Sequence, residues 1–484
     1  MSPALPLPLQ MARCWLDGQW VAAADGDTIP VHDPASGELL GTVPRLGVAD
    51  TRHAIEAAER ALGPWRDRTA DDRARLLRRW ADLVMARQDD LALLMTREQG
   101  KPLAEAKGEI AYAASYIEWF AEEARRVYGD VMPSPWADRQ LIAVKEHVGV
   151  CAAVTPWNFP AAMITRKAAP ALAAGCTMIV KPASQTPLSA LALARLAEEA
   201  GIPGGVLQVI TGSASAIGGE LTRHPAVRKL SFTGSTEVGR TLAAQCAPTL
   251  KKLSLELGGN APFIVFDDAD LDAAVQGAIA SKYRNTGQTC VCTNRILVKA
   301  GVYDEFAARL ARAVEQLQVG PGVEPGVAQG PLIDRAALEK VEQLVADAVG
   351  RGARVVTGGR RHARGGTFFQ PTLLADVPAD ALLAKEEIFG PVAPLFRFET
   401  EDDALRMAND TEFGLAAYFY SRDVGRVWRV SRRLEVGMVG INSGLISTAV
   451  APFGGVKQSG YGREGSRHGI EEYVQLKYLC MGVA

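Results

Sequence analysis

The chain has 484 residues, of which 48% are hydrophobic and 22% are charged, and this balance is typical of a folded globular protein rather than a disordered one. Its 53 Lys and Arg residues nearly match its 55 Asp and Glu residues, so a net charge of −2 gives no reason to expect nucleic acid or an anionic membrane as a partner. The length allows about three domains at roughly 150 residues each.

Because the sequence shows no secretory signal and no membrane span, we expect the protein in the cytoplasm, with an organelle matrix as the alternative. Residues 1–10 alternate proline with leucine and have no basic flank before a continuous apolar run, unlike a secretory signal. The uncharged stretch 147–165 contains Pro156, Asn158 and Pro160, which a membrane helix would not tolerate so close together. The seven cysteines are scattered, as expected in a reducing compartment: Cys14, Cys151, Cys176, Cys246, Cys290, Cys292 and Cys480.

The first half of the chain predicts helices followed by a doubly wound parallel sheet. Helical periodicity of apolar residues covers 73–97 and 104–128. From residue 149 the pattern changes to short apolar runs separated by helical or glycine-rich segments, which is the mark of such a sheet. The predicted strands are 150–154, 177–180, 206–210, 229–232 and 253–257.

The second half predicts a second α/β domain, which begins after a Gly-Gly turn within 257–260. Two further segments, 140–148 and 473–481, are extended and partly alternating. Because a long exposed edge strand invites pairing with another chain, we interpret both as assembly elements; strands within the chain's own sheet are an equally weighted alternative. The strands predicted for the second domain are 296–298, 354–356, 393–398, 417–420 and 438–441.

Two glycine-containing motifs could bind a dinucleotide. The segment 460–465 matches the fingerprint G-x-G-x-x-G, but too few residues follow it for the helix, strand and acidic residue that the fingerprint needs, so we interpret it as a turn. The segment 232–239 follows a predicted strand and opens a helix, so its N–H groups could face a pyrophosphate, although a plain strand-to-helix turn has the same composition. The six histidines form no close cluster, and no metal site is predicted.

Three polar residues, Cys290, Glu256 and Asn158, each have a catalytic and a structural interpretation. Cys290 lies in a polar, glycine-containing segment after a predicted helix, a setting suited to an exposed thiolate, although a buried Cys is usually a small hydrophobe. Glu256 lies in an apolar strand, where a carboxylate is either paired structurally or raised in pKa for general-base work. Asn158 either caps the helix that Pro160 can start or donates a hydrogen bond to an oxyanion.

Seven motifs occur together over nearly the whole chain: TPWNFP, KPASQTP, FTGSTEVG, LELGGNAPFIVF, GQTC, EEIFGP and PFGGVKQSG. In this order and approximate spacing they resemble the aldehyde dehydrogenase superfamily, and runs such as EQGKPLAEAKGEI and RNTGQTCVCTNR are most similar to its bacterial succinate-semialdehyde dehydrogenases. The resemblance implies an α/β fold with three parts. These are a Rossmann-like cofactor-binding domain (1–130 and 149–256), a second α/β catalytic domain (257–467) and a small β oligomerisation element (131–148 and 468–484).

The resemblance also implies the catalytic roles. Cys290 attacks the aldehyde to give a thiohemiacetal, and Asn158 with the Cys290 N–H holds the oxyanion. Loss of hydride leaves a thioester, which Glu256 hydrolyses by activating water. Superfamily members that pass the acyl group to coenzyme A generally lack this carboxylate, so a free acid product is expected.

The implied cofactor is NADP, with NAD as the weaker alternative. Relatives that prefer NAD often carry Glu at the position of Ser184. Ser184 is uncharged and cannot repel the 2′-phosphate of NADP, and Lys181 could neutralise that phosphate. A solvated surface charge is the alternative for Lys181, and an ordinary salt bridge is the alternative for Glu387. The implied cofactor-binding residues are Trp157, Lys181, Ser184, Gly234, Ser235, Gly239, Glu387 and Phe389.

For the substrate, the resemblance points to Arg166, Arg284 and Ser447 as partners of a distal carboxylate, although most arginines are merely solvated or salt-bridged. We expect oxidation of succinic semialdehyde, with glutaric semialdehyde as the alternative. A cofactor-free cysteine hydrolase or acyltransferase and a non-catalytic homologue are the other classes weighed. Apart from this small molecule, the only partner expected is a second copy of the chain, in a dimer or tetramer.

Cys292 lies two residues after the proposed nucleophile. Some relatives use such a pair as a reversible oxidative lock, and a disulfide across so short a ring would be strained and readily reduced. We favour the interpretation of Cys292 as an inert neighbour.

Overall fold

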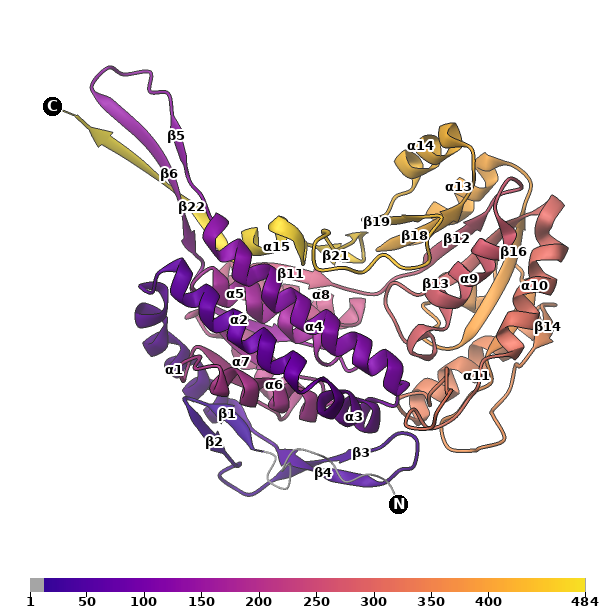
Figure 1. Ribbon diagram of the computed structural model, residues 1–484, viewed down its shortest axis with the longest axis horizontal. Coiled ribbons are helices and arrows are strands. Elements are labelled where there is room, and N and C mark those ends of the chain that lie inside the picture. The colour runs from indigo at the N-terminus through magenta and orange to yellow at the C-terminus, as the bar shows by residue number, and fades with distance from the viewer. Residues whose placement is uncertain (1–12, 484) are drawn as a thin grey trace.

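The computed structural model describes residues 13–483, so the interpretation of residues 1–10 lies outside the described part. Figure 1 shows two α/β bodies side by side and a narrow β-ribbon that leaves the first body and carries the C-terminus. The fold class is confirmed: a Rossmann-like unit with a parallel sheet stands beside a second α/β unit. Within residues 13–483, no helix has the length and apolar character needed to cross a membrane.

The first body is built on an eight-stranded sheet in the order β2-β1-β9-β8-β7-β10-β11-β21. Five neighbouring strands of this sheet, β9, β8, β7, β10 and β11, run parallel, and each confirms a predicted strand to within two residues at each end. The strands β1 and β21 pair with the two ends of this set in the antiparallel direction. Strand succession reverses direction between β7 and β10, which is where open α/β sheets bind ligands. The strands are β1 (Cys14–Leu16), β2 (Gln19–Val21), β7 (Val150–Val154), β8 (Thr177–Lys181), β9 (Leu207–Val209), β10 (Val227–Thr233), β11 (Lys252–Glu256) and β21 (Gly460–Tyr461).

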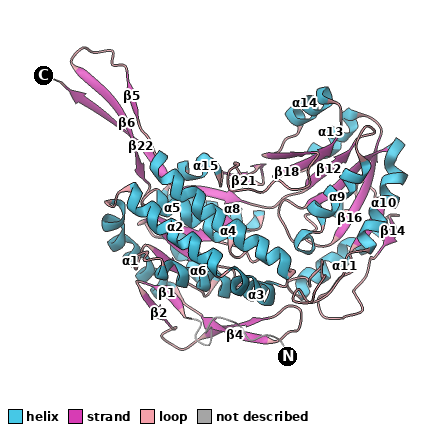
Figure 2. Cartoon of the chain, viewed as in Figure 1, coloured by secondary structure: helices cyan, strands magenta, loops and turns pink. Residues whose placement is uncertain are grey.

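Helices cover both faces of this sheet. Successive residues of β7 point to opposite faces, so Cys151 and Ala153 belong to one hydrophobic cluster, while Val150 and Ala152 belong to another. The helices α2 to α6 pack in the first cluster, and α1, α7 and α8 in the second (Figure 2). They are α1 (Val48–Arg66), α2 (Ala70–Ala86), α3 (Gln88–Gln99), α4 (Leu103–Glu123), α5 (Ala162–Ala173), α6 (Pro187–Glu199), α7 (Ala214–Arg223) and α8 (Thr236–Cys246).

The predicted single helix over 73–97 is wrong, because the structure divides it into α2 and α3. Arg87 leaves the helical conformation between them, with φ −109° and ψ 21°. Asp89 and Asp90 then supply negative charge in the first turn of α3, where the helix dipole favours it. Apolar periodicity continues across the break and therefore could not reveal it.

The second body contains a seven-stranded sheet in the order β14-β15-β16-β13-β12-β18-β19, parallel except for β14. The sequence missed β12 and β15. Pro262 disfavours a central strand, but in β12 it lies beside a register shift against β13. The strands are β12 (Ala261–Val265), β13 (Thr293–Lys299), β14 (Arg354–Thr357), β15 (Thr372–Ala375), β16 (Val392–Phe398), β18 (Ala416–Tyr420) and β19 (Met438–Ile441).

The helices of the second body include two that matter for the site. α9 (Leu271–Lys282) leads into the segment that carries Cys290, and α11 (Arg335–Gly350) carries Lys340. The remaining helices of this body are α10 (Tyr303–Glu315), α12 (Leu382–Lys385), α13 (Glu401–Asn409) and α14 (Val424–Arg433), whereas α15 (Ser466–Glu471), near the C-terminus, packs against α4 and α5 of the first body.

The two extended segments pair with each other rather than with either large sheet. β6 (Arg139–His147) lies antiparallel to β22 (Val474–Gly482) along its whole length, and β5 (Asp130–Met132) adds a third strand. The ribbon projects from the first body, and Leu476 and Tyr478 remain 68% and 57% exposed. Two small antiparallel pairs complete the described strands: the hairpin of β3 (Thr28–His32) with β4 (Leu39–Pro44), and the pair of β17 (Phe413–Gly414) with β20 (Val456–Lys457), which are distant in sequence.

Candidate active site

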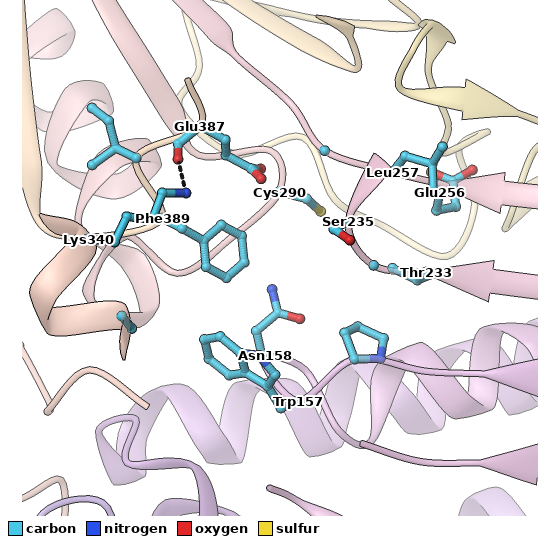
Figure 3. A pocket seen from close by; sticks show the side chains of 15 residues that line it. Trp157, Asn158, Thr233, Ser235, Glu256, Leu257, Cys290, Lys340, Glu387 and Phe389 are labelled. Carbon is cyan, nitrogen blue, oxygen red and sulfur yellow. Dashed lines mark hydrogen bonds between the residues drawn. The ribbon is translucent and has the colours of Figure 1, made fainter. Parts of the chain in front are cut away.

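A cavity of about 240 Å³ lies between the two bodies, where the carboxyl ends of β7, β10 and β11 face the segment around Cys290 (Figure 3). Its position at the reversal of strand order is the one at which α/β sheets bind ligands. The lining unites residues from six separate stretches of the sequence. The predicted site residues in this lining are Trp157, Asn158, Gly234, Ser235, Glu256, Cys290, Glu387 and Phe389.

Cys290 is half-buried in this cavity, not an exposed thiolate as its local sequence suggested. Burial raises the pKa of its thiol to about 12; the Arg166 charge opposes this shift, and the charges of Glu387 and Glu256 add to it. In the ligand-free protein the group is therefore a protonated thiol at neutral pH. Its conversion to a nucleophile requires a base or a change in surroundings.

The backbone before Cys290 follows an unusual path. Asn285, Thr286 and Gly287 are left-handed in succession, with φ of 50°, 57° and 76°. A Cβ atom on Gly287 would lie 2.1 Å from the Gly390 carbonyl oxygen, and one on Gly259 would lie 2.4 Å from the Cys290 oxygen. The glycines of the GQTC and LELGGN motifs thus permit close backbone approach around the thiol.

Asn158 does not cap α5. The Glu109 carboxylate accepts the N–H groups of Ala161 and Ala162 at 2.9 and 3.3 Å and so takes that place. The Asn158 carboxamide instead faces the cavity and donates to the Gln288 carbonyl at 2.9 Å (Figure 3). This leaves the amide beside the thiol, in the position suited to an oxyanion donor.

The main chain of Asn158 is held from a second side. Its carbonyl accepts from the Lys101 ammonium at 2.8 Å and from the Asn285 carboxamide at 3.0 Å. Lys101 is buried, forms an ion pair with Glu109 and lies 4.0 Å from the Phe159 ring centroid. A network of buried polar groups therefore fixes this residue on the cavity wall.

Glu256 ends β11 with 2% exposure, and neither carboxylate oxygen has a hydrogen-bond partner within residues 13–483. Its pKa is raised well above its ordinary value, chiefly by burial and then by the charge of Glu464, while Arg166 and Lys167 oppose the shift. Structural pairing, one of the two sequence interpretations, is absent from the described residues. A buried, unpaired carboxyl group is a suitable general base once it is deprotonated.

The three predicted substrate-binding residues do not lie together. Arg284 and Ser447 line a second cavity, of about 520 Å³, where the Arg284 guanidinium lies 4.9 Å from the Phe159 ring centroid. Arg166 is 1% exposed, forms an ion pair with Glu464 and lies 4.5 Å from the Phe453 ring centroid. Its charge is therefore engaged inside the first body.

Two of the residues predicted to bind the cofactor contact each other: Phe389, with φ 54°, packs edge to face against Trp157, with ring centroids 5.6 Å apart. Glu387 forms no salt bridge among the described residues; its carboxylate accepts the Gly259 N–H at 3.1 Å, and burial raises its pKa to about 7. The Lys340 ammonium, which the sequence did not single out, donates to the Glu387 carbonyl at 2.7 Å (Figure 3).

Lys181, Ser184 and Gly239 lie outside the lining of this cavity. Lys181 is 4% exposed rather than a solvated surface charge, and burial lowers its pKa to about 8. The Gly239 N–H bonds to the Ser235 carbonyl within α8, and a Cβ atom there would lie 2.4 Å from a Leu257 methyl group. Gly239 therefore permits close packing of α8 on the strand end instead of donating to a phosphate.

Cys292 is buried and its thiol donates to the Lys282 carbonyl at 2.9 Å, so it is already hydrogen-bonded away from the cavity. Gly460, in the rejected fingerprint, pairs with Glu256 at the sheet edge. Within residues 13–483 no group of three or more His, Cys, Asp or Glu side chains is placed to hold a metal ion.

The fold and this cavity define a class of protein: residues 20–479 match the aldehyde dehydrogenase family, and the chain belongs to it. It is 65% identical to the NADP⁺-dependent succinate-semialdehyde dehydrogenase of Escherichia coli and to the glutarate-semialdehyde dehydrogenase of Pseudomonas aeruginosa, with 97% of each chain covered in both comparisons. Among solved structures, that of succinate-semialdehyde dehydrogenase from Burkholderia pseudomallei is 65% identical, covers 99% of this chain and 100% of its own, and superposes with a TM-score of 0.98.

The pKa of Cys290 leads to a test on the ligand-free protein. With a pKa of about 12, the thiolate fraction rises about tenfold per pH unit below that value. The rate of alkylation by iodoacetamide should therefore rise about a hundredfold from pH 7 to 9, without a plateau. The exposed Cys480 is first replaced by Ser, and the modified site is identified by mass spectrometry. A plateau at or below pH 8 would show that the thiol is activated in the resting protein.

Proposed function

We propose that this protein oxidises succinic semialdehyde to succinate with NADP⁺, through covalent catalysis by Cys290. The observation that carries the proposal is the meeting of Cys290, Asn158 and Glu256 in one cavity between the two bodies. The relatives at 65% identity support the choice of an aldehyde with a distal carboxylate.

The chemistry follows from these side chains. The Cys290 sulfur forms a bond to the aldehyde carbon, its proton passes to the deprotonated Glu256 carboxylate, and the Asn158 amide with the Cys290 N–H stabilises the oxyanion. Glu256 releases this proton to solvent before the hydrolysis step. When bound, NADP⁺ would supply the acceptor for the hydride that leaves the substrate carbon as the thioester forms. Glu256, again a carboxylate, then takes a proton from water, whose oxygen attacks the thioester carbon; the carbon–sulfur bond breaks, the free acid leaves, and the thiolate recovers a proton from Glu256.

The residues present suit a dinucleotide. At the start of α8 the Ser235 hydroxyl accepts the Val238 N–H at 3.4 Å, and the N–H groups before Val238 have no partner within the helix; the turn of Gly234 and Ser235 lies at the cavity edge. Trp157 and Phe389 provide apolar walls for a nicotinamide ring, and Glu387 provides an acceptor for a ribose hydroxyl. Lys181 and Ser184 would lie toward the adenosine end, where Ser184 leaves space for a 2′-phosphate.

Arg284 and Ser447 are the partners proposed for the substrate carboxylate, since both line the second cavity. Arg166 supports the reaction from inside the first body, where it neutralises Glu464 and acts on the charges of Cys290 and Glu256. Glutaric semialdehyde is the second candidate substrate, favoured by the relative from P. aeruginosa. The ratio of kcat/KM for the two aldehydes decides between them.

The organisation proposed around this site keeps the three parts expected from the sequence. These are a cofactor-binding domain of 1–130 and 149–256, a catalytic domain of 257–467 and an assembly element of 131–148 and 468–484. The exposed apolar side chains on the β6–β22 ribbon support self-association, as a dimer or a tetramer, in the cytoplasm. The strand β21 is a point of contact between the parts, because it comes from the catalytic segment and joins the first sheet.

Replacing Cys290 tests the proposal directly. Cys290→Ala should abolish NADPH formation from succinic semialdehyde and leave NADP⁺ binding unchanged, because the thiol forms the covalent bond and does not hold the cofactor. Absorbance at 340 nm and cofactor titration by protein fluorescence measure the two effects. Appreciable residual turnover in this variant would remove the assignment, whereas a cofactor-independent thioesterase activity of the wild type would favour the hydrolase class.

Ser184→Glu tests the choice of cofactor. A carboxylate near the 2′-phosphate should repel NADP⁺ but not NAD⁺, so the ratio of their kcat/KM values should shift toward NAD⁺ by about tenfold or more. Both cofactors are compared in wild type and variant with the same aldehyde. Equal ratios in the two proteins would place Ser184 away from the phosphate.

Arg284→Leu tests the substrate site. Loss of a charged, hydrogen-bonded contact costs roughly 2 to 5 kcal/mol, so kcat/KM for succinic semialdehyde should fall about 30-fold or more, while that for butanal holds steady. Arg166→Leu is the comparison: it leaves buried Glu464 without this partner and should reduce turnover of both aldehydes. Equal losses for both aldehydes in Arg284→Leu would instead mean that Arg284 supports the Cys290 segment.

A further inference from the structure

Glu105 is a carboxylate in an unexpected place. It lies in the first turn of α4 and lines the same cavity as Arg284 and Ser447, where the substrate carboxylate is proposed to bind. An ionised Glu105 carboxylate in that cavity would repel the carboxylate of the substrate and so oppose its binding. Its presence there therefore calls for a role that outweighs this repulsion.

The contact that Glu105 makes lies next to the reactive cysteine. Its carboxylate accepts the Asn285 N–H at 2.7 Å, across the boundary between the two bodies. Asn285 is fully buried, and a buried N–H without an acceptor is strongly unfavourable. The start of α4 is fixed on the same side, because the Leu103 N–H donates to the Gly322 carbonyl at 2.9 Å.

Asn285 connects this contact to the proposed oxyanion site. Its carboxamide donates to the Asn158 carbonyl at 3.0 Å and to the Gln288 carbonyl at 3.2 Å. The Asn158 carboxamide donates to the same Gln288 carbonyl at 2.9 Å. A shift of Asn285 would therefore move both the amide of Asn158 and the peptide that leads to Cys290.

The backbone at Asn285 also needs an external support. Asn285 and Thr286 are both left-handed, a conformation that Asn tolerates and a β-branched residue such as Thr disfavours. Such strain persists only where the surroundings hold it in place. The Glu105 carboxylate supplies one of those restraints, at the first left-handed residue.

We propose that Glu105 is a positioning residue of the oxyanion site: it holds the Asn285 N–H and, through Asn285, aligns the Asn158 amide with Cys290. This inference rests on the proposed roles of Cys290 and Asn158. Glu105 touches neither of them, and its effect passes through one hydrogen bond to the backbone.

Two substitutions separate the acceptor from the charge. Glu105→Gln keeps an oxygen that accepts the Asn285 N–H and removes the negative charge, whereas Glu105→Leu removes both. Glu118→Leu is the matched control, because Glu118 is an exposed residue of the same helix. With NADP⁺ saturating, kcat and KM are measured for succinic semialdehyde and for butanal, and hydrogen exchange is measured for the peptide that contains Asn285.

Glu105→Leu should lower kcat about tenfold or more for both aldehydes, because a small displacement of the amide and thiol weakens transition-state binding whatever the far end of the substrate. Its KM for NADP⁺ should stay unchanged and its Asn285 N–H should exchange faster. Glu105→Gln should keep kcat near the wild-type value without raising the KM for succinic semialdehyde, and Glu118→Leu should match wild type. If Glu105→Leu does not fold, Glu105→Asp replaces it, since the shorter side chain withdraws the acceptor while keeping the charge.

Three results would overturn the proposal: wild-type kcat in Glu105→Leu, equal impairment in Glu105→Gln and Glu105→Leu, or a loss confined to the KM of the carboxylate-ended aldehyde. The last would mean that Glu105 acts through the charge of Arg284. Failure of the proposed function is distinguishable, because turnover would then not depend on Cys290, while exchange at Asn285 would still report the Glu105 contact.

Discussion

The hydrogen bond from the Asn158 carboxamide to the Gln288 carbonyl joins the two bodies beside Cys290, the proposed nucleophile. Asn158 follows β7 of the first sheet, and Gln288 lies between the left-handed residues and Cys290 on the second body. Because protein interiors are close-packed, the surrounding glycines, the buried Lys101 and the Glu109 carboxylate must all accommodate this one contact. The cavity has its shape because these groups meet there.

Burial is the second constraint on the site, and it shifts several groups toward their neutral forms. It raises the pKa of the Cys290 thiol to about 12 and that of Glu387 to about 7, and it lowers the pKa of Lys181 to about 8. Burial also raises the pKa of Glu256 well above its ordinary value. Arg166, which forms an ion pair with Glu464, opposes the shifts of Cys290 and Glu256, and Lys167 beside it opposes that of Glu256.

The two cavities have different proposed roles, and residues of both bodies line each of them. The smaller one holds the reacting groups and the cofactor-facing residues, and the larger one holds Arg284 and Ser447 for the far end of the substrate. Phe159 lines the larger cavity, where its ring contacts Arg284, and it follows directly after Asn158, which lines the smaller one. A carboxylate-ended aldehyde of suitable length is thereby favoured by charge at one end and by covalent chemistry at the other.

The sequence by itself determined the α/β class, the parallel strands of the first sheet and the motifs around Asn158, Glu256 and Cys290, because apolar runs and glycine turns are local signals. It missed β12, where Pro262 obscured the strand, and the break at Arg87, which leaves the apolar period intact. Only the tertiary structure decided that Arg166 pairs with Glu464, that Glu256 has no partner among the described residues and that Glu105 supports Asn285. These properties depend on burial and on partners far away in the sequence, and the spacing of residues within a motif predicts neither.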